Sequence, residues 1–173
     1  MTPVFRPFRP DDTEAVVALW DTCGLLRPWN DPYRDIARKV AEQPELFLVA
    51  EVDASTADPS ATGPNATGPS GMHPSTAPAL GIVGAGMAGY DGHRGWVNYL
   101  AVRPDQQGSG LGRAFMAEFE RLLRARGCPK VNVQVREGNE QVLGFYASLG
   151  YAEDRAVSLG KRLVVDDRRS RTP

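Results

Sequence analysis

The chain has 173 residues, of which 42% are hydrophobic, so it is long enough for one well-packed core and short for two. Its 20 Lys and Arg residues nearly balance its 21 Asp and Glu residues, which excludes the strongly basic surface that nucleic acid or an anionic membrane would require. Cys23 and Cys128 lie far apart and form no CxxC pair, which indicates reduced thiols and no metal site.

The sequence also gives an expectation of location. It contains no signal peptide and no apolar run of membrane-spanning length. Together with the reduced cysteines, this predicts a cytoplasmic protein.

Residues 54–79 differ from the rest of the chain in composition. They are almost wholly Ala, Ser, Thr, Gly and Pro, and the sequence ATGP occurs in them as a direct repeat. Such a segment buries too little apolar surface to offset the entropy lost on ordering it. We therefore expect a single domain over residues 1–166, interrupted by a disordered low-complexity loop at 54–79 and followed by a frayed basic tail at 167–173. The composition assigns the loop no function.

The residues before this loop predict two strands and two helices. A short strand is expected over 4–8, followed by a helix that Asp11 or Asp12 caps. A second helix over 30–43 has Asp31 as its cap and Pro32 at its first position. A strand over 46–52 then leads into the loop.

The residues after the loop predict a sheet with both pairing directions. The expected elements are strands over 80–90 and 96–102, a helix over 111–126, a strand over 130–135, a helix over 139–149 and a last strand over 158–167. Hairpin connections make the early strands antiparallel, whereas the helix between 96–102 and 130–135 requires a parallel crossover. The fold class is therefore α/β, with a mixed sheet covered by helices.

A glycine-rich stretch, "QGSGLG", opens the helix over 111–126. Backbone N–H groups at a helix N-terminus favour a phosphate group, and glycines let a pyrophosphate approach the main chain closely. A dinucleotide fingerprint is excluded because Arg113 occupies the place of its third glycine. A nucleotide P-loop is excluded because "GRAF" lacks the lysine and the magnesium-binding hydroxyl.

Two motifs in register give the chain a family resemblance. "QGSGLG" matches the Gln/Arg-x-x-Gly-x-Gly/Ala signature of the GNAT (Gcn5-related) N-acetyltransferases, and "NEQVLGFYASLGY" matches the second half of that signature. The matching positions are Gln107, Gly110, Gly112, Asn139, Tyr146, Gly150 and Tyr151. The resemblance covers nearly the whole chain outside the loop and the tail. The blocks "LLRPWNDP", "YDGHRG", "ARGCPK" and "VSLGKRL" are most similar to the bacterial YpeA-like acetyltransferases.

The resemblance implies a fold and a reaction. The fold is a central mixed sheet of six to seven strands with a splayed strand pair, flanked by about four helices. The reaction is transfer of an acetyl group from acetyl-CoA, as co-substrate and without a metal, to a primary amine by direct attack in a ternary complex. The resemblance leaves the acceptor open between a small amine, an amino acid, a peptide N-terminus and a lysine side chain. It also leaves open whether the protein forms a homodimer.

The resemblance also implies the residues that bind acetyl-CoA. The backbone groups of Leu100 and Val102 are expected to bind the pantetheine arm. The glycine-rich loop is expected to bind the pyrophosphate. The expected cofactor-binding residues are Leu100, Val102, Gln107, Gly108, Ser109, Gly110, Leu111, Gly112, Arg113 and Asn139. Asn139 is either a helix N-cap alone or a cap whose amide also reaches the cofactor.

Tyr146 is the expected catalytic residue. A phenol with a pKa of about 10 stays protonated at neutral pH, so it can donate a proton to the departing thiolate. The alternative is that Tyr146 is a core aromatic beside Phe145.

The base and the acceptor site remain open on the sequence alone. His93, Asp31, Asp91, Tyr99 and a water relay are the candidates for the base, although His93 belongs first to a hairpin turn. The turn over 25–31 has two interpretations. It contributes Arg27, Trp29, Asn30 and Asp31 to the acceptor-binding site, or it is a packed turn between helices with Trp29 in the core.

Two other classes of protein also remain. A non-catalytic acyl-CoA-binding or regulatory module would not need Tyr146. A structural or interaction protein would leave both GNAT motifs unexplained.

Overall fold

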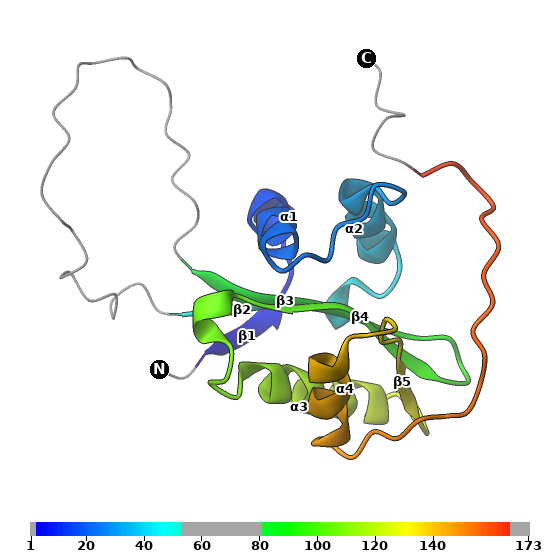
Figure 1. Ribbon diagram of the computed structural model, residues 1–173. Helices are drawn as coiled ribbons and strands as arrows, with labels where there is room; N and C mark the ends of the chain where they lie inside the picture. Colours follow the sequence, from blue (N-terminus) through cyan, green and yellow to red (C-terminus); the bar gives the residue numbers. More distant parts are fainter. Residues whose placement is uncertain (1–2, 53–80, 167–173) are drawn as a thin grey trace, which may run out of the picture.

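The computed structural model describes residues 3–52 and 81–166, so the predictions for the 54–79 loop and the 167–173 tail lie outside the described residues. In chain order the elements are β1 (Val4–Pro7), α1 (Thr13–Thr22), α2 (Pro32–Ala41), β2 (Phe47–Glu51), β3 (Ile82–Tyr90), β4 (Gly95–Val102), α3 (Leu111–Arg124), β5 (Val131–Val133) and α4 (Glu140–Ala147) (Figure 1). Short 3-10 turns precede α1, β2 and α3 at Pro10–Asp12, Pro44–Leu46 and Pro104–Gln106.

The strands form one mixed sheet in the order β1-β2-β3-β4-β5. The pairs from β1 to β4 are antiparallel, and β4 pairs with β5 in parallel. The parallel pair follows from α3, because a helix between two strands returns the chain to the same end of the sheet. The predicted mixed α/β fold is confirmed.

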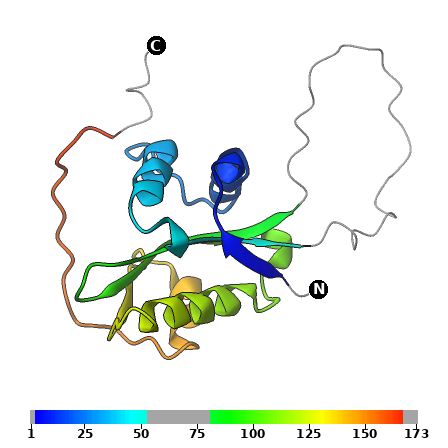
Figure 2. The same ribbon diagram turned by 180° about the vertical axis from the view of Figure 1, so that it is seen from behind.

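The helices cover both faces of this sheet. Figure 2 shows α1 and α2 on one face and α3 and α4 on the other. Strand β2 supplies both layers, because successive side chains point to opposite faces. Phe47 and Val49 pack under α1 and α2, whereas Leu48 and Ala50 pack under α3. This inner strand therefore contributes to both cores.

Glycines in β3 let α3 approach the sheet closely. A Cβ atom added to Gly84 would lie 2.5 Å from Cε2 of Phe115, and one added to Gly86 would lie 3.0 Å from Cε2 of Phe119. Both phenylalanines are fully buried. The sheet therefore has recesses at these glycines, and the rings of α3 fill them.

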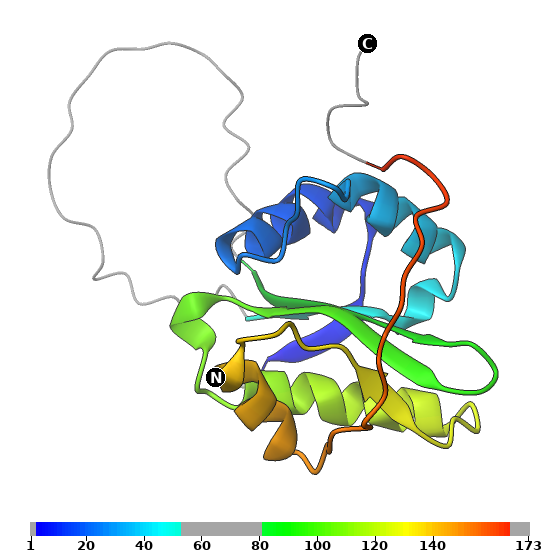
Figure 3. The same ribbon diagram turned by 45° about the vertical axis from the view of Figure 1, so that its right-hand side comes forward.

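The strand predicted over 158–167 does not form within its described residues, 158–166, and the described sheet has five strands instead of six to seven. This part of the chain leaves the β5 side of the sheet and runs past the sheet edge toward α2, where Asp166 pairs with Arg38 (Figures 1 and 3). The side chain of Gln134 donates to Ser158, and Lys130 pairs with Asp154 just before the segment, so side chains hold its start where a backbone ladder was expected. Val157 and Leu159 are 87% and 91% exposed. Alternating apolar residues predict a strand, but a strand also needs a paired edge.

An ion-pair cluster lies where the sequence predicted a helix cap. Asp12 precedes α1, yet its carboxylate accepts from the guanidinium of Arg6 at 2.7 and 2.8 Å and from the backbone N–H of Arg9 at 2.7 Å. Arg6 also pairs with Glu51 on β2. Burial alone would raise the pKa of Asp12, but the bonds from Arg6 and Arg9 outweigh it and the pKa is lowered. Asp12 therefore binds Arg6 and does not cap the helix.

Candidate functional site

Strands β4 and β5 part after three residue pairs. The parallel ladder runs from Gly95 and Val131 to Val97 and Val133, while β4 continues to Val102. We call the segment Asn98–Val102, which has no described strand partner on the β5 side, the free β4 edge. The carbonyl oxygen of Val102 accepts from Nε2 of Gln107 at 3.0 Å. The first residue of the glycine-rich loop is thus bonded to the end of this edge.

A bulge with a strained residue lies within the free β4 edge. Ala85 and Met87 on β3 pair with Ala101 and Asn98, so β4 holds one residue more than β3 over this stretch. Tyr99 lies in the extra stretch with a φ of 53°, in the left-handed region that non-glycine residues seldom adopt. The bulge changes the direction of the strand at the point where β5 has left it.

The side chain of Tyr99 is fixed on the face that α1 and α2 cover. Its ring stacks on Trp20 of α1, with ring centroids 4.4 Å apart. Its hydroxyl donates to Oδ2 of Asp35 on α2 at 2.7 Å. Burial and then this hydrogen bond raise the pKa of Tyr99 to about 12. The phenol therefore stays protonated at neutral pH, which argues against Tyr99 as a general base.

The glycine-rich loop leads into the N-terminus of α3. Gly108 and Gly110 have φ values of 77° and 89°, which favour glycine at both positions. The N–H of Ala114 donates to the carbonyl of Gly110 at 3.0 Å, so the N–H groups of residues 111–113 precede the first turn of helical hydrogen bonds. The positive end of the helix dipole lies at the same place. This arrangement can bind an anionic group.

Helix α4 lies against the start of α3. A Cβ atom added to Gly112 would lie 3.2 Å from Cζ of Phe145, and Nη2 of Arg113 donates to the Ser148 hydroxyl at 3.3 Å. Oδ1 of Asn139 accepts from the N–H of Val142 at 3.3 Å, which confirms Asn139 as the N-cap of α4. The two GNAT-like motifs of the sequence therefore meet in space.

Tyr146 lies half-buried on α4 with its ring between two other aromatic rings. Its centroid is 5.0 Å from that of Phe145 and 5.5 Å from that of Tyr151. It packs against the same apolar core as Leu100 and Val102 of the free β4 edge. Burial raises the pKa of the Tyr146 hydroxyl, so it is protonated at neutral pH.

The turn over 25–31 has the predicted helix cap, but its tryptophan is not in the core. Asp31 caps α2, since its Oδ1 accepts from the N–H of Tyr33 at 2.9 Å. Arg27 bonds to the turn's own carbonyl groups at Gly24 and Leu26, at 2.8 and 2.7 Å. Trp29 is 48% exposed, so the alternative that placed it in the core is wrong. The side chain of Asn30 lies near enough to Tyr99 to lower the pKa of the phenol, against the larger raising effects of burial and Asp35.

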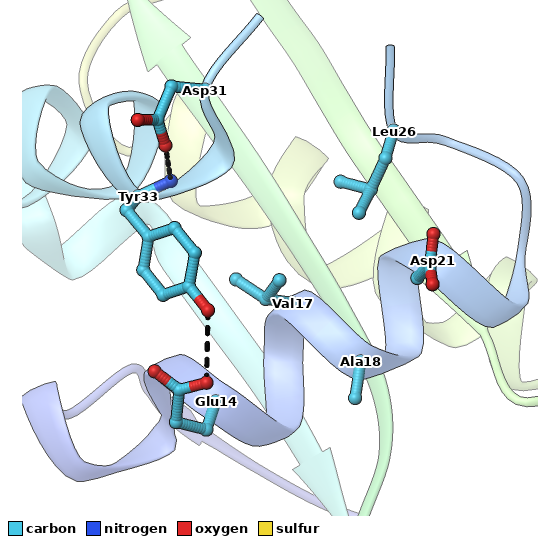
Figure 4. A pocket seen from close by; sticks show the side chains of 7 residues that line it. All are labelled: Glu14, Val17, Ala18, Asp21, Leu26, Asp31 and Tyr33. Atoms are coloured by element: carbon cyan, nitrogen blue, oxygen red, sulfur yellow. Dashed lines mark hydrogen bonds between the residues drawn. The ribbon is translucent and has the colours of Figure 1, made fainter. Parts of the chain in front are cut away.

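A pocket of about 320 Å³ lies between α1 and the start of α2 (Figure 4). It is lined by Glu14, Val17, Ala18, Asp21, Leu26, Asp31 and Tyr33. The hydroxyl of Tyr33 donates to Oε2 of Glu14 at 3.0 Å across the pocket. Of the residues predicted to bind the donor or the acceptor, Asp31 alone lines it. The pocket is therefore separate from the glycine-rich loop and Tyr146.

The remaining base candidates lie in the β3–β4 turn. Oδ1 of Asp91 accepts from the N–H groups of His93 and Arg94 at 2.7 and 2.6 Å, as in an Asx turn. These backbone bonds lower the pKa of Asp91, and the His93 residue is exposed. The turn interpretation of His93 is confirmed.

Two features are absent from the described residues, 3–52 and 81–166. None of their helices is both long enough and apolar enough to cross a bilayer. No group of three or more His, Cys, Asp or Glu side chains among them is placed to hold a metal ion.

Comparisons with known proteins agree on one family. Residues 69–151 match the model of the Acetyltransferase (GNAT) family. An acetyltransferase of Yersinia pseudotuberculosis is 46% identical over 161 residues, which cover 93% of this chain and 96% of that protein. The crystal structure of Ard1 from Thermoplasma volcanium has a TM-score of 0.65 at 23% identity, covering 88% of this chain and 84% of that one. AAC(6')-Iy, solved with a CoA-containing bisubstrate analogue, has a TM-score of 0.64 at 14% identity, covering 94% and 99%.

The fold is that of an acyltransferase, with a mixed sheet that opens between two parallel strands next to a glycine-rich helix entry. The identity to the Yersinia protein over nearly the full length of both chains specifies the family. The chain belongs to the GNAT acetyltransferase family, and the protein is an N-acetyltransferase enzyme.

Sequence reasoning missed two residues near the free β4 edge, Asp35 and Trp20. Asp35 lies four residues after Asp31 on α2, a spacing that places both on one helix face. Trp20 belongs to the apolar stripe of α1. These patterns mark faces of helices, but nothing in the sequence pairs either residue with a tyrosine on a distant strand.

Proposed function

We propose that the protein moves an acetyl group from acetyl-CoA to a primary amine by direct attack in a ternary complex. The observation that carries this proposal is that α4, which bears the half-buried Tyr146, packs through Phe145 against Gly112 at the helix entry formed by Gly108 to Arg113. The first motif binds the donor's pyrophosphate, and the second brings a proton donor to the same side of the sheet.

Donor binding would use backbone groups at two places. The N–H groups at the start of α3 bind the pyrophosphate of acetyl-CoA, with Gln107 and Ser109 shaping the loop. The backbone of Leu100 and Val102, on the free β4 edge, binds the pantetheine arm as a neighbouring strand would. Arg113 and Asn139 complete the donor site at its α4 side.

The reaction follows from these positions. The amine nitrogen attacks the thioester carbonyl carbon, a C–N bond forms, and the C–S bond breaks. The nitrogen loses a proton to solvent or to a base. Tyr146 gives its proton to the departing CoA thiolate, which its raised pKa allows at neutral pH.

The first experiment separates the donor from other phosphate ligands. Acetyl-CoA should raise the melting temperature of the protein, whereas NAD and ATP should leave it unchanged. Thiol release from acetyl-CoA is then measured across a panel of small amines, amino acids and peptides. Binding of acetyl-CoA without transfer to any of them would favour the non-catalytic module instead.

Tyr146→Phe tests the proton donor. We expect its kcat to fall by about 10²-fold, because general acid catalysis contributes roughly that much. Tyr151→Phe is the matched control, since Tyr151 belongs to the same aromatic group but its hydroxyl donates to Glu120 at 2.9 Å. Unchanged turnover in Tyr146→Phe, with a good acceptor, would refute the role of Tyr146.

A further inference from the structure

We propose that Tyr99 is a positioning residue of the acetyl transfer and that it acts through Asp35. The hydrogen bond between them holds the bulge of β4 and thereby aims the backbone of residues 100–102 at the donor. This inference rests on the proposed function, because it concerns how that reaction's donor is held.

The first support is the backbone of Tyr99 itself. A φ of 53° is unfavourable for a residue with a bulky side chain, and such conformations persist where the surroundings hold them. Tyr99 is the one residue of the described strands with a positive φ that is not glycine, and it lies two residues beyond the last β4–β5 pair at Val97. The strain is thus located where the two strands part.

The second support is that the side chain is held at both ends. The ring stacks on Trp20, which is fully buried on α1, at 4.4 Å. The hydroxyl donates to Asp35 on α2 at 2.7 Å. Contacts from two helices fix the orientation of the phenol, and a fixed phenol restricts the backbone that carries it.

The third support is the way in which Asp35 is itself held. Its other oxygen, Oδ1, accepts from Nη1 of Arg38 at 3.1 Å, and Arg38 also pairs with Asp166 at 2.5 Å. The carboxylate is 20% exposed, so it lies at the edge of the layer and not free in solvent. Both oxygens of Asp35 therefore accept hydrogen bonds, one from Tyr99 and one from Arg38.

The last step connects the bulge to the donor. The N–H of Arg103 donates to Val83 of β3 at 2.8 Å, so the backbone groups of the preceding residue, Val102, point away from β3. The bond from Gln107 to the Val102 carbonyl confirms that direction. A change in the bulge at Tyr99 would rotate these groups relative to the donor.

The experiment compares Tyr99→Phe with Asp35→Ala and Asp35→Asn. Tyr99→Phe keeps the ring on Trp20 and removes only the hydroxyl, and Asp35→Ala removes the acceptor. Both should lower kcat by about tenfold, because a small misplacement of reacting groups has effects of this order or larger. Asp35→Asn should keep more of the wild-type kcat than Asp35→Ala, since its amide oxygen can still accept from Tyr99 although its amide nitrogen cannot accept from Arg38.

Two further measurements separate positioning from simple loss of folding. The double variant Tyr99→Phe with Asp35→Ala should be no slower than either single variant, because both remove one interaction. If Tyr99 positions the donor, KM for the amine should stay within about twofold and the thermal shift by acetyl-CoA should persist. A merely structural role would instead lower the melting temperature and leave kcat per folded molecule unchanged. Tyr90→Phe is the matched control, since its hydroxyl donates to Gly92 in the β3–β4 turn at 3.1 Å.

The outcomes distinguish the two proposals. If the wild type binds acetyl-CoA and acetylates no amine, the proposed function is wrong and this inference is wrong with it. If the wild type acetylates an amine and Tyr99→Phe has an unchanged kcat, the inference alone is wrong. Additive losses in the double variant would also refute it.

Discussion

The two faces of the sheet are stabilised in different ways. Under α3 and α4, aromatic rings fill recesses at glycines, as Phe115 does at Gly84 and Phe145 does at Gly112. Under α1 and α2, polar groups bind specific partners, as Tyr99 binds Asp35 and Arg6 binds Asp12. Both faces bury an apolar core, but close contacts between rings and glycines distinguish the first face, and hydrogen bonds between side chains distinguish the second. The face that is proposed to bind the donor is the first one.

The largest expected effect on stability tests the face of the sheet under α1 and α2. Arg6→Met leaves the carboxylate of Asp12, whose side chain is 10% exposed, without its cation. We expect the free energy of unfolding to fall by about 3 kcal/mol, because an unpaired buried charge is costly. Urea denaturation at pH 7 measures the loss. Arg121→Met removes an exposed pair with Glu118 and should cost less than about 1 kcal/mol.

This prediction has a pH dependence. The lowered pKa of Asp12 adds stability that is present above its ordinary value of 3.8 and is lost as the pH falls through the folded value. The gap between the wild type and Arg6→Met should therefore shrink in strong acid. A gap that is constant down to pH 2 would show that Asp12 does not carry the effect.

A smaller effect on stability tests the face of the sheet under α3 and α4. Gly84→Ala places a Cβ atom 2.5 Å from the ring of Phe115, which is fully buried and cannot move freely. We expect a loss of about 2 kcal/mol by urea denaturation, because overpacking forces neighbouring groups to shift. Gly89→Ala in the same strand is the control, since its nearest atom, Oε1 of Gln43, lies at 3.9 Å. Equal losses in both variants would mean that β3 itself, and not the recess, requires glycine.

The smallest effect concerns a polar group on α2 that is imperfectly paired. Nζ of Lys39 donates to the carbonyl of Glu42 at 3.1 Å, while the nearby Glu45 pairs with Arg126 at 2.7 Å. Burial is the main cause that lowers the pKa of Lys39 to about 8. The folded state thus disfavours the charged lysine, and stability should rise between pH 8 and the ordinary lysine pKa of 10.5.

Lys39→Met removes this penalty. We expect its melting temperature at pH 7 to exceed that of the wild type by on the order of 2 °C, with the gap narrowing as the pH approaches 10. Differential scanning calorimetry measures both values. Lys161→Met changes an exposed lysine and should show neither effect. A melting temperature below that of the wild type would mean that the Lys39–Glu42 bond outweighs the burial of charge.

The contrast between the two faces also explains what the sequence predicted. The glycine-rich loop, the apolar stripe of α3 and the cap at Asn139 are local patterns, and the structure has each of them where it was expected. The bond between Tyr99 and Asp35 joins residues 64 positions apart, and that between Arg38 and Asp166 joins residues 128 apart. No spacing rule connects such pairs. The strand predicted over 158–167 was wrong for a related reason, because pairing with a distant edge cannot be read from alternation alone.

The join between β2 and β3 has a consequence for the two cores. The N–H of Val52 donates to the carbonyl of Gly81 at 2.9 Å, so the two sides of the connection meet as a closed hairpin stem. Because this bond joins two described residues, the β2–β3 pairing that contributes to both cores is closed off at Val52 and Gly81.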